Sequence, residues 1–155
     1  MSGLIAARLK ELGIVLPIPA PPQGAYVPCV QSGALLFVSG QIPLGSQGLA
    51  YVGTVGGEIN LEDANRAARL AAVNVIAQVS SALDGDLDRV KRVVKVTGFV
   101  NAASGFTQHP EVVNGASELF AQVFGEAGRH ARAAVGASSL PRNVAVEVEA
   151  IFEIA

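Results

Sequence analysis

A long alanine-rich helical pattern over residues 60–83 restricts the possible folds more than any other feature of the chain. Asn60 and the acidic pair Glu62 and Asp63 mark its start, and Gly85 marks its end. Two strand patterns precede this helix, and a strand, a second helix and two more strands follow it. Helices separated by strand pairs predict an α+β fold, in which a single mixed β-sheet packs against two helices.

No linker or internal repeat divides the sequence. We therefore expect one domain over residues 1–155, with residues 1–16 as an N-terminal helical extension whose apolar face carries Leu4, Ile5, Leu9 and Leu12. The other predicted elements are an extended connector (17–24), a hairpin whose second strand is largely buried (27–31 and 34–39), a loop (41–58), a strand (90–101), a helix that begins at Pro110 (111–125) and two final strands (132–138 and 144–154).

The composition predicts a closely packed core and an oligomer. Half of the 155 residues are apolar, but aromatic residues are few and tryptophan is absent. Small side chains must therefore fill the core, and they also suit close packing between subunits, which could cover the free face of the sheet. The net charge is −2 and the cationic residues are scattered. Because phosphate binding needs clustered cations, this pattern disfavours nucleic acid as a partner.

Cysteine and histidine are too sparse for a disulfide or a metal centre. Cys29 is the single cysteine, and His109 and His130 lack metal-ligand spacing to it or to each other. A lone thiol without a nearby histidine is a poor candidate nucleophile and suits a reducing compartment. The N-terminus lacks the apolar core of a signal peptide, and no apolar run is long enough to span a membrane. We expect a cytoplasmic protein without a membrane partner.

Arg132 is the first candidate functional residue, because it interrupts a strand pattern of small, uncharged residues. Burying an unpaired charge costs on the order of several kcal/mol. On an alternating strand, Ala134 and Gly136 share its face and leave space beside it. A guanidinium can hold a carboxylate through two parallel hydrogen bonds. The spacing leaves two interpretations open: a clamp for a substrate carboxylate, or a structural ion pair or surface arginine.

Glu147 is the second candidate. It lies on the polar face of the last strand pattern, opposite a face that begins with Val144 and Val146. If the two final strands form a hairpin, Glu147 lies about opposite Arg132. A carboxylate there could order a water molecule and exchange a proton with it, or it could simply neutralise the arginine.

Several strings together resemble the Rid family (reactive intermediate deaminase, also called YjgF-like and long labelled L-PSP endoribonuclease). The most specific pair is Ser-Gly-Gln-Ile-Pro at residues 39–43 with Ala-Arg, Leu-Pro and Val-Glu-Val-Glu-Ala towards the C-terminus. The matching segments cover most of the chain: 24–26, 37–43, 74–76, 95–100, 131–132, 140–141 and 146–150.

The resemblance implies a chorismate-mutase-like fold and a homotrimer with active sites between subunits. It also implies hydrolysis of enamines and imines of the 2-aminoacrylate type to a 2-keto acid and ammonia, with neither metal nor cofactor. By motif, Arg132 matches the residue that holds the substrate carboxylate, and Glu147 matches the residue associated with the attacking water. Tyr26 and Ser39 match residues that line the cleft.

The sequence also departs from the family pattern. Ser104 stands where we expect the polar residue that follows the third strand, and His130 precedes Ala131-Arg132 without the usual proline. These departures leave the natural substrate open. They also keep a second function in view, a regulatory or metabolite-binding trimer that holds a 2-keto acid in the same cleft without turnover. Cleavage of RNA, the activity in the old family label, is disfavoured by the charge pattern.

Overall fold

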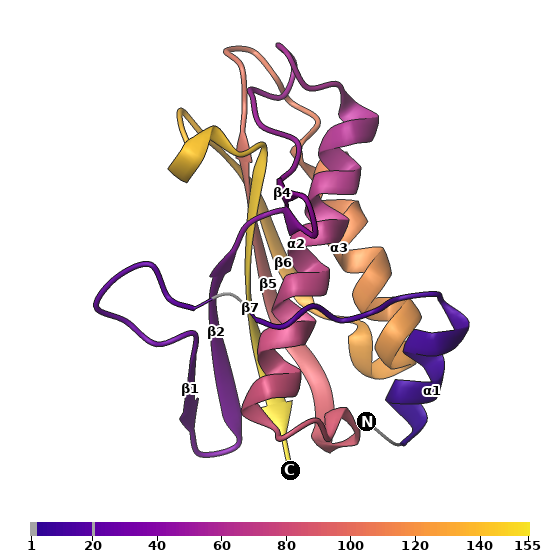
Figure 1. Ribbon diagram of the computed structural model, residues 1–155. Coiled ribbons are helices and arrows are strands. Elements are labelled where there is room, and N and C mark those ends of the chain that lie inside the picture. The colour runs from indigo at the N-terminus through magenta and orange to yellow at the C-terminus, as the bar shows by residue number, and fades with distance from the viewer. Residues whose placement is uncertain (1–2, 20) are drawn as a thin grey trace.

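A computed structural model describes residues 3–19 and 21–155 (Figure 1). Met1 and Ser2 of the expected N-terminal helix and Ala20 of the expected connector lie outside the described residues. The elements in chain order are α1 (Leu4–Glu11), β1 (Cys29–Ser32), β2 (Leu35–Gln41), β3 (Leu44–Gly45), β4 (Gly48–Leu49), α2 (Leu61–Ala82), η1 (Leu87–Arg89), β5 (Val90–Asn101), α3 (His109–Phe124), η2 (Gly125–Gly128), β6 (Ala131–Ala137), η3 (Pro141–Asn143) and β7 (Val146–Ile154).

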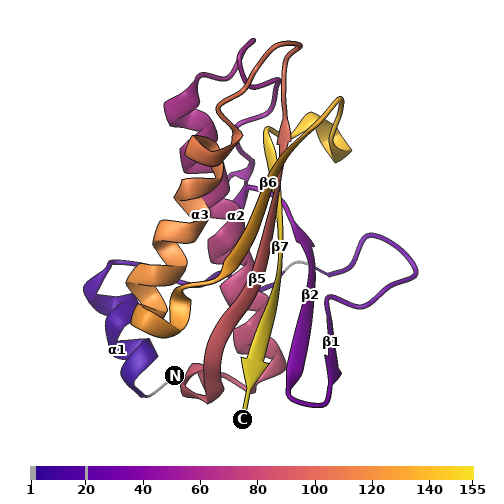
Figure 2. The same cartoon turned by 180° about the vertical axis from the view of Figure 1, so that it is seen from behind.

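The main sheet has five strands in the order β1-β2-β7-β5-β6. β5 and β6 run parallel, and the other neighbouring pairs are antiparallel. Helix α2 packs on β2 and β7, and α3 packs on β5 and β6, so both long helices cover the same face (Figures 1 and 2). The prediction of an α+β fold with one mixed sheet is confirmed. We call the other side of the sheet the open face.

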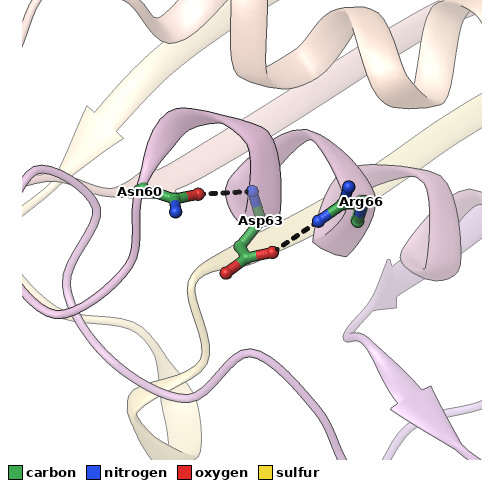
Figure 3. Close-up of polar contacts among 3 residues, drawn as sticks. All are labelled: Asn60, Asp63 and Arg66. Atoms are coloured by element: carbon green, nitrogen blue, oxygen red, sulfur yellow. Dashed lines mark hydrogen bonds and ion pairs between the residues drawn. The ribbon is translucent and has the colours of Figure 1, made fainter.

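Helix α2 begins as the sequence predicts. Asn60 Oδ1 accepts a hydrogen bond from the Asp63 backbone N–H at 2.8 Å, and the Asp63 carboxylate pairs with Arg66 at 2.9 Å (Figure 3). At the other end, the Gly85 N–H donates to the Ser80 carbonyl at 2.8 Å with a φ of +87°, which favours glycine. Local cap chemistry therefore sets both ends of the longest helix.

Close contact between α2 and α3 fixes the helical layer. A Cβ on Gly115 of α3 would collide with the backbone carbonyl of Asn65 in α2, so only glycine permits this spacing. The sheet contributes a regular apolar face, in which alternate residues of β7 are buried under the helices: Val146, Val148, Ala150, Phe152 and Ile154.

The predicted hairpin of the two final strands is wrong. β6 pairs in parallel with β5, and β7 lies on the other side of β5 between β5 and β2. The β5-α3-β6 segment is a crossover unit, in which the intervening helix returns the chain to the same end of the sheet and makes the two strands parallel. Arg132 and Glu147 therefore do not form a cross-strand pair.

Three smaller predictions also change. β2 is buried on only one face, because Leu35 and Phe37 point to the open face and remain exposed. The predicted loop over residues 41–58 contains the short β3–β4 ladder. In α1, Ile5 and Leu9 are buried as expected, whereas Leu4 and Leu12 are exposed.

The predicted first hairpin is confirmed, with Cys29 of β1 opposite Val38 of β2.

Candidate functional site

Arg132 lies on β6, the edge strand next to α3. Its neighbour across the ladder is Val96, which is fully buried, so Arg132 points to the helix-covered face. The Arg132 Nη1 donates to Asn114 Oδ1 at 2.8 Å and to Ser117 Oγ at 3.1 Å, both on α3. These acceptors are neutral. None of the ion pairs in residues 3–19 and 21–155 includes Arg132, so its positive charge is positioned without being compensated by a carboxylate.

Asn114 and Ser117 were not identified from the sequence. They are three residues apart on α3 and therefore share a helical face. The signal that could have found them is a pair of polar residues among apolar ones, since Val113, Ala116 and Phe120 around them are buried. That pattern becomes informative only once α3 is known to cross β6 at Arg132.

His130 extends this cluster. Its Nε2 lies 2.9 Å from Ser117 Oγ, and its Nδ1 lies 2.7 Å from the Gly128 carbonyl oxygen. The ring also makes an edge-to-face contact with Phe120 at 5.8 Å between centroids. Burial lowers the pKa of His130, and the positive charge of Arg132 lowers it further, against an opposing effect of the Gly128 hydrogen bond. His130 is therefore neutral near pH 7.

Glu147 lies elsewhere, on the open face of β7. Its ladder neighbour Phe99 lies opposite Val135 of β6, so the side chains of this row alternate with the helix-covered row that contains Arg132. Burial raises the pKa of Glu147, and the nearby charge of Glu149 raises it further. The carboxylate packs over Gly40 at the bulge of β2, where a Cβ would collide with it. A carboxyl group with a raised pKa is suited to proton exchange.

Ser39 and Tyr26 lie near the first hairpin. The Ser39 hydroxyl donates to the Val27 carbonyl at 2.9 Å, and the Tyr26 hydroxyl accepts from the Gln23 N–H at 3.1 Å. Tyr26 is 49% exposed, in a loop that projects away from the helices (Figure 1). On the open face, Ser39 lines a shallow hollow of about 270 Å³ with Val30, Phe37, Val38, Lys95, Thr97, Glu149, Ala150 and Ile151.

The candidate residues thus form two clusters. The clamp cluster contains Arg132, Asn114, Ser117 and His130 and lies at the β6 edge, under α3. The hairpin cluster is defined by position and not by mutual contact: Ser39 and Glu147 lie on the open face, and Tyr26 lies in the loop before β1. Ser104 lies in an exposed turn between β5 and α3, outside both clusters.

The remaining candidates do not join either cluster. Cys29 is half-buried, and desolvation raises the pKa of its thiol to about 11, which makes it a poor nucleophile. His109 packs edge-to-face on Phe106 at 5.3 Å between centroids. In the part of the chain that the structure describes, no group of His, Cys, Asp and Glu residues could hold a metal ion, and no helix is long and apolar enough to cross a membrane.

A protein-family model matches almost the whole chain. Residues 6–154 match a family model described as "YjgF/chorismate_mutase-like, putative endoribonuclease". The Protein TCP17 of Trypanosoma cruzi is 49% identical over 154 residues, which is 99% of this chain and 96% of that protein.

Solved structures share the fold. The protein Atu1372 of Agrobacterium tumefaciens, described as having unknown function, superposes with a TM-score of 0.91 at 52% identity, over 97% of this chain and 92% of that chain. TdcF of E. coli, whose structure contains bound serine, superposes with a TM-score of 0.60 at 29% identity, over 89% of this chain and 94% of that chain.

Proposed function

This chain belongs to the YjgF/chorismate-mutase-like family, and on that premise we propose that it hydrolyses small 2-imino acids of the 2-aminoacrylate type to a 2-keto acid and ammonia. The observation that carries the proposal is the state of Arg132. Its guanidinium is held by Asn114 and Ser117, two neutral groups, and is therefore oriented while it keeps its charge for a substrate anion.

The reaction adds water to the C=N carbon and then expels ammonia. In the first step a base takes a proton from the water as the new C–O bond forms, and the imine nitrogen gains a proton. In the second step the amino group of the carbinolamine gains a proton and leaves as ammonia, while the hydroxyl proton is removed and the C=O bond of the 2-keto acid forms. Glu147 suits both transfers because its raised pKa lets it accept and return a proton. Positioning and one such group provide about 10²–10⁴-fold acceleration.

We propose that the working site combines the clamp cluster of one subunit with the hairpin cluster of another. Within one chain, Arg132 and Glu147 lie on different faces of the sheet with strand β5 between their strands. β1 and β6 are the two edges of the sheet, and a cyclic assembly joins different patches of neighbouring copies. A homotrimer, as the family resemblance implies, would bring the β6 edge of each copy to the hairpin of the next.

The test is the release of 2-keto acid from freshly generated 2-iminopropionate, compared between the wild type and Arg132→Ala. Arg129→Ala is the matched control, because Arg129 is an exposed arginine that pairs only loosely with Glu126 at 3.5 Å. We expect acceleration by the wild type and by Arg129→Ala, and none by Arg132→Ala in an assembly of unchanged mass. Undiminished release by Arg132→Ala would refute the role of this residue.

A binding function without turnover is the alternative. The bound serine in the TdcF structure supports it, because serine carries a carboxylate of the kind that an oriented arginine holds. This alternative predicts saturable binding of a 2-keto acid that depends on Arg132, with no acceleration of imine hydrolysis. Both outcomes can be measured on the same preparations.

A further inference from the structure

A chain of hydrogen bonds leads from Arg132 through Ser117, which holds the guanidinium, to His130, which the proposed reaction does not use. Arg132 Nη1 lies 3.1 Å from Ser117 Oγ, Ser117 Oγ lies 2.9 Å from His130 Nε2, and His130 Nδ1 lies 2.7 Å from the Gly128 carbonyl oxygen. All three distances are within hydrogen-bonding range. The chain therefore connects the guanidinium to a group that changes charge near neutral pH.

The chemistry of its two ends fixes the direction of this chain. A guanidinium can only donate, and a carbonyl can only accept. Neutral His130 must therefore carry its proton on Nδ1, towards Gly128, and its Nε2 accepts the hydroxyl proton of Ser117. The lone pairs of Ser117 Oγ then face Arg132. Each donor in this series of hydrogen bonds therefore faces an acceptor, and hydrogen bonds aligned in one direction strengthen each other.

Packing holds the far end of the chain in place. Gly128 is buried, and a Cβ there would collide with the backbone carbonyl of Phe120 in α3. The Phe120 ring contacts the imidazole of His130 edge-to-face. The Gly128 carbonyl and the Phe120 ring thus determine where His130 lies, and His130 determines how Ser117 meets the guanidinium.

Protonation of His130 would place a second cation behind Arg132. Nε2–H and Nη1–H would then both point at Ser117 Oγ, and the Ser117 hydroxyl would have to turn away from both. An anion bound to the guanidinium would offset both positive charges and could accept that hydroxyl proton. The other charged groups on the elements around His130 lie on exposed or opposite surfaces: Glu111 and Glu118 on α3, Glu126 and Arg129 at η2, and Lys91, Arg92 and Lys95 on β5.

We propose that Ser117 and His130 are positioning residues for Arg132, and that His130 takes up a proton when a carboxylate binds to the guanidinium. The inference rests on the proposed function, since it requires an anion site at Arg132. Its consequence is that the anion binds more tightly as the pH falls. We expect the added positive charge to raise affinity by about tenfold, which corresponds to a rise of about one unit in the pKa of His130 on binding.

The test is the dissociation constant of a 2-keto acid, whose carboxylate stays ionised, measured by calorimetry between about pH 5 and pH 8. The wild type should bind about tenfold more tightly at the low end. His130→Gln should bind with the same affinity at both ends of the range, because glutamine can accept from Ser117 and donate to Gly128 but cannot be protonated. His109→Gln, which changes the other histidine of the chain, should keep the full gain.

A second measurement does not depend on a variant that folds well. The imidazole signals of the two histidines can be followed by NMR in the wild-type protein with and without the 2-keto acid. Saturation with the anion should raise the pKa of His130 and leave that of His109 in place. Binding that is independent of pH, or an unchanged His130 titration, would overturn this inference alone. Failure of the anion to bind at any pH would overturn the proposed site as well.

Discussion

At the scale of single residues, Glu147 lies in an environment that disfavours its charged form. Its pKa is raised in the folded protein, so the folded state holds the proton more tightly than the unfolded chain does. That difference favours folding at low pH, and the advantage is lost as the pH rises through the unfolded value of about 4.3 and then through the raised folded value.

The Glu147→Gln variant should therefore be more stable than the wild type at neutral pH, although it loses hydrolysis of the imine. The gain should disappear at a pH below the unfolded value, where both side chains are neutral. Urea unfolding at the two pH values measures it. A variant that is less stable than the wild type at neutral pH would show that the carboxylate has a favourable partner.

Gly40 gives a way to move Glu147 without removing it. A Cβ at residue 40 would collide with the Glu147 carboxylate, so Gly40→Ala should displace this side chain. We expect hydrolysis to fall by about 10²-fold or more, the contribution of one general acid–base group, while the affinity for a 2-keto acid stays the same. Gly45→Ala is the matched control, because its Cβ would make only an ordinary contact with Leu70 at 3.7 Å. Equal activity in both variants would contradict the assigned position of Glu147.

The sequence drew attention to Arg132 and Glu147, because a strand of small residues and an alternating strand make such charges visible. It could not identify Asn114 or Ser117. Their importance depends on where α3 crosses β6, and that crossing is decided by contacts such as the one between Gly115 and Asn65. Tertiary packing, and not local pattern, selects the partners of the guanidinium.

At the scale of elements, one carboxylate adds a polar link between α1 and the rest of the fold, beside the buried side chains of Ile5 and Leu9. Asp88 accepts hydrogen bonds from the Leu4 and Ile5 N–H groups, both at 2.9 Å, and so caps a helix that lies far from it in the sequence. The Ile5 and Leu4 hydrogen bonds lower the pKa of Asp88. This attachment is present above the unfolded value of about 3.9 and is lost as the pH falls through the lowered folded value.

Asp88→Ala should therefore release α1 while the sheet stays intact. Faster amide hydrogen exchange in residues 4–11, with unchanged exchange in β5 and β7, is the expected result. Asp86→Ala serves as the control because it changes an exposed aspartate of the same turn. Equal protection of α1 in both variants would contradict the capping role.

The close contact between α2 and α3 predicts an effect on the stability of the whole protein. Gly115→Ala would force the Asn65 carbonyl and α2 away from α3, which should destabilise the protein by about 1–3 kcal/mol. Chemical denaturation measures the change. Glu118→Ala on the exposed side of the same helix should change stability by less than about 0.5 kcal/mol. A neutral Gly115→Ala would mean that the two helices can separate at no cost.

Most elements were predictable because their signals are local. The Asn60 cap, Gly85 and the β-branched run of β5 gave boundaries close to those observed. The pairing of β6 was not predictable in the same way. β6 and β7 are close in sequence, which suggests a hairpin. Instead, the crossover through α3 places β6 parallel to β5.

At the scale of the whole molecule, the open face carries exposed apolar side chains on three of its strands and no helix covers it. Val30, Phe37 and Val135 are 52%, 42% and 42% exposed, and they spread over β1, β2 and β6. The helices cover only the other face (Figure 2). Such a face is typical of a surface that another subunit covers, which agrees with the proposed homotrimer. The sequence predicted that a partner subunit would cover this face, because one sheet with all of its helices on one side leaves the second side bare.

The central claim is that one active site takes Arg132 from one subunit and Glu147 from the next. It is tested most directly by assembling Arg132→Ala and Glu147→Gln chains together, by coexpression with two tags, and measuring the hydrolysis of 2-iminopropionate. Each variant alone should be inactive. In random mixed trimers, about one interface in four combines both intact residues, so about a quarter of the wild-type rate should return. Mixed assemblies of the correct mass that stay as inactive as either parent would contradict the shared site.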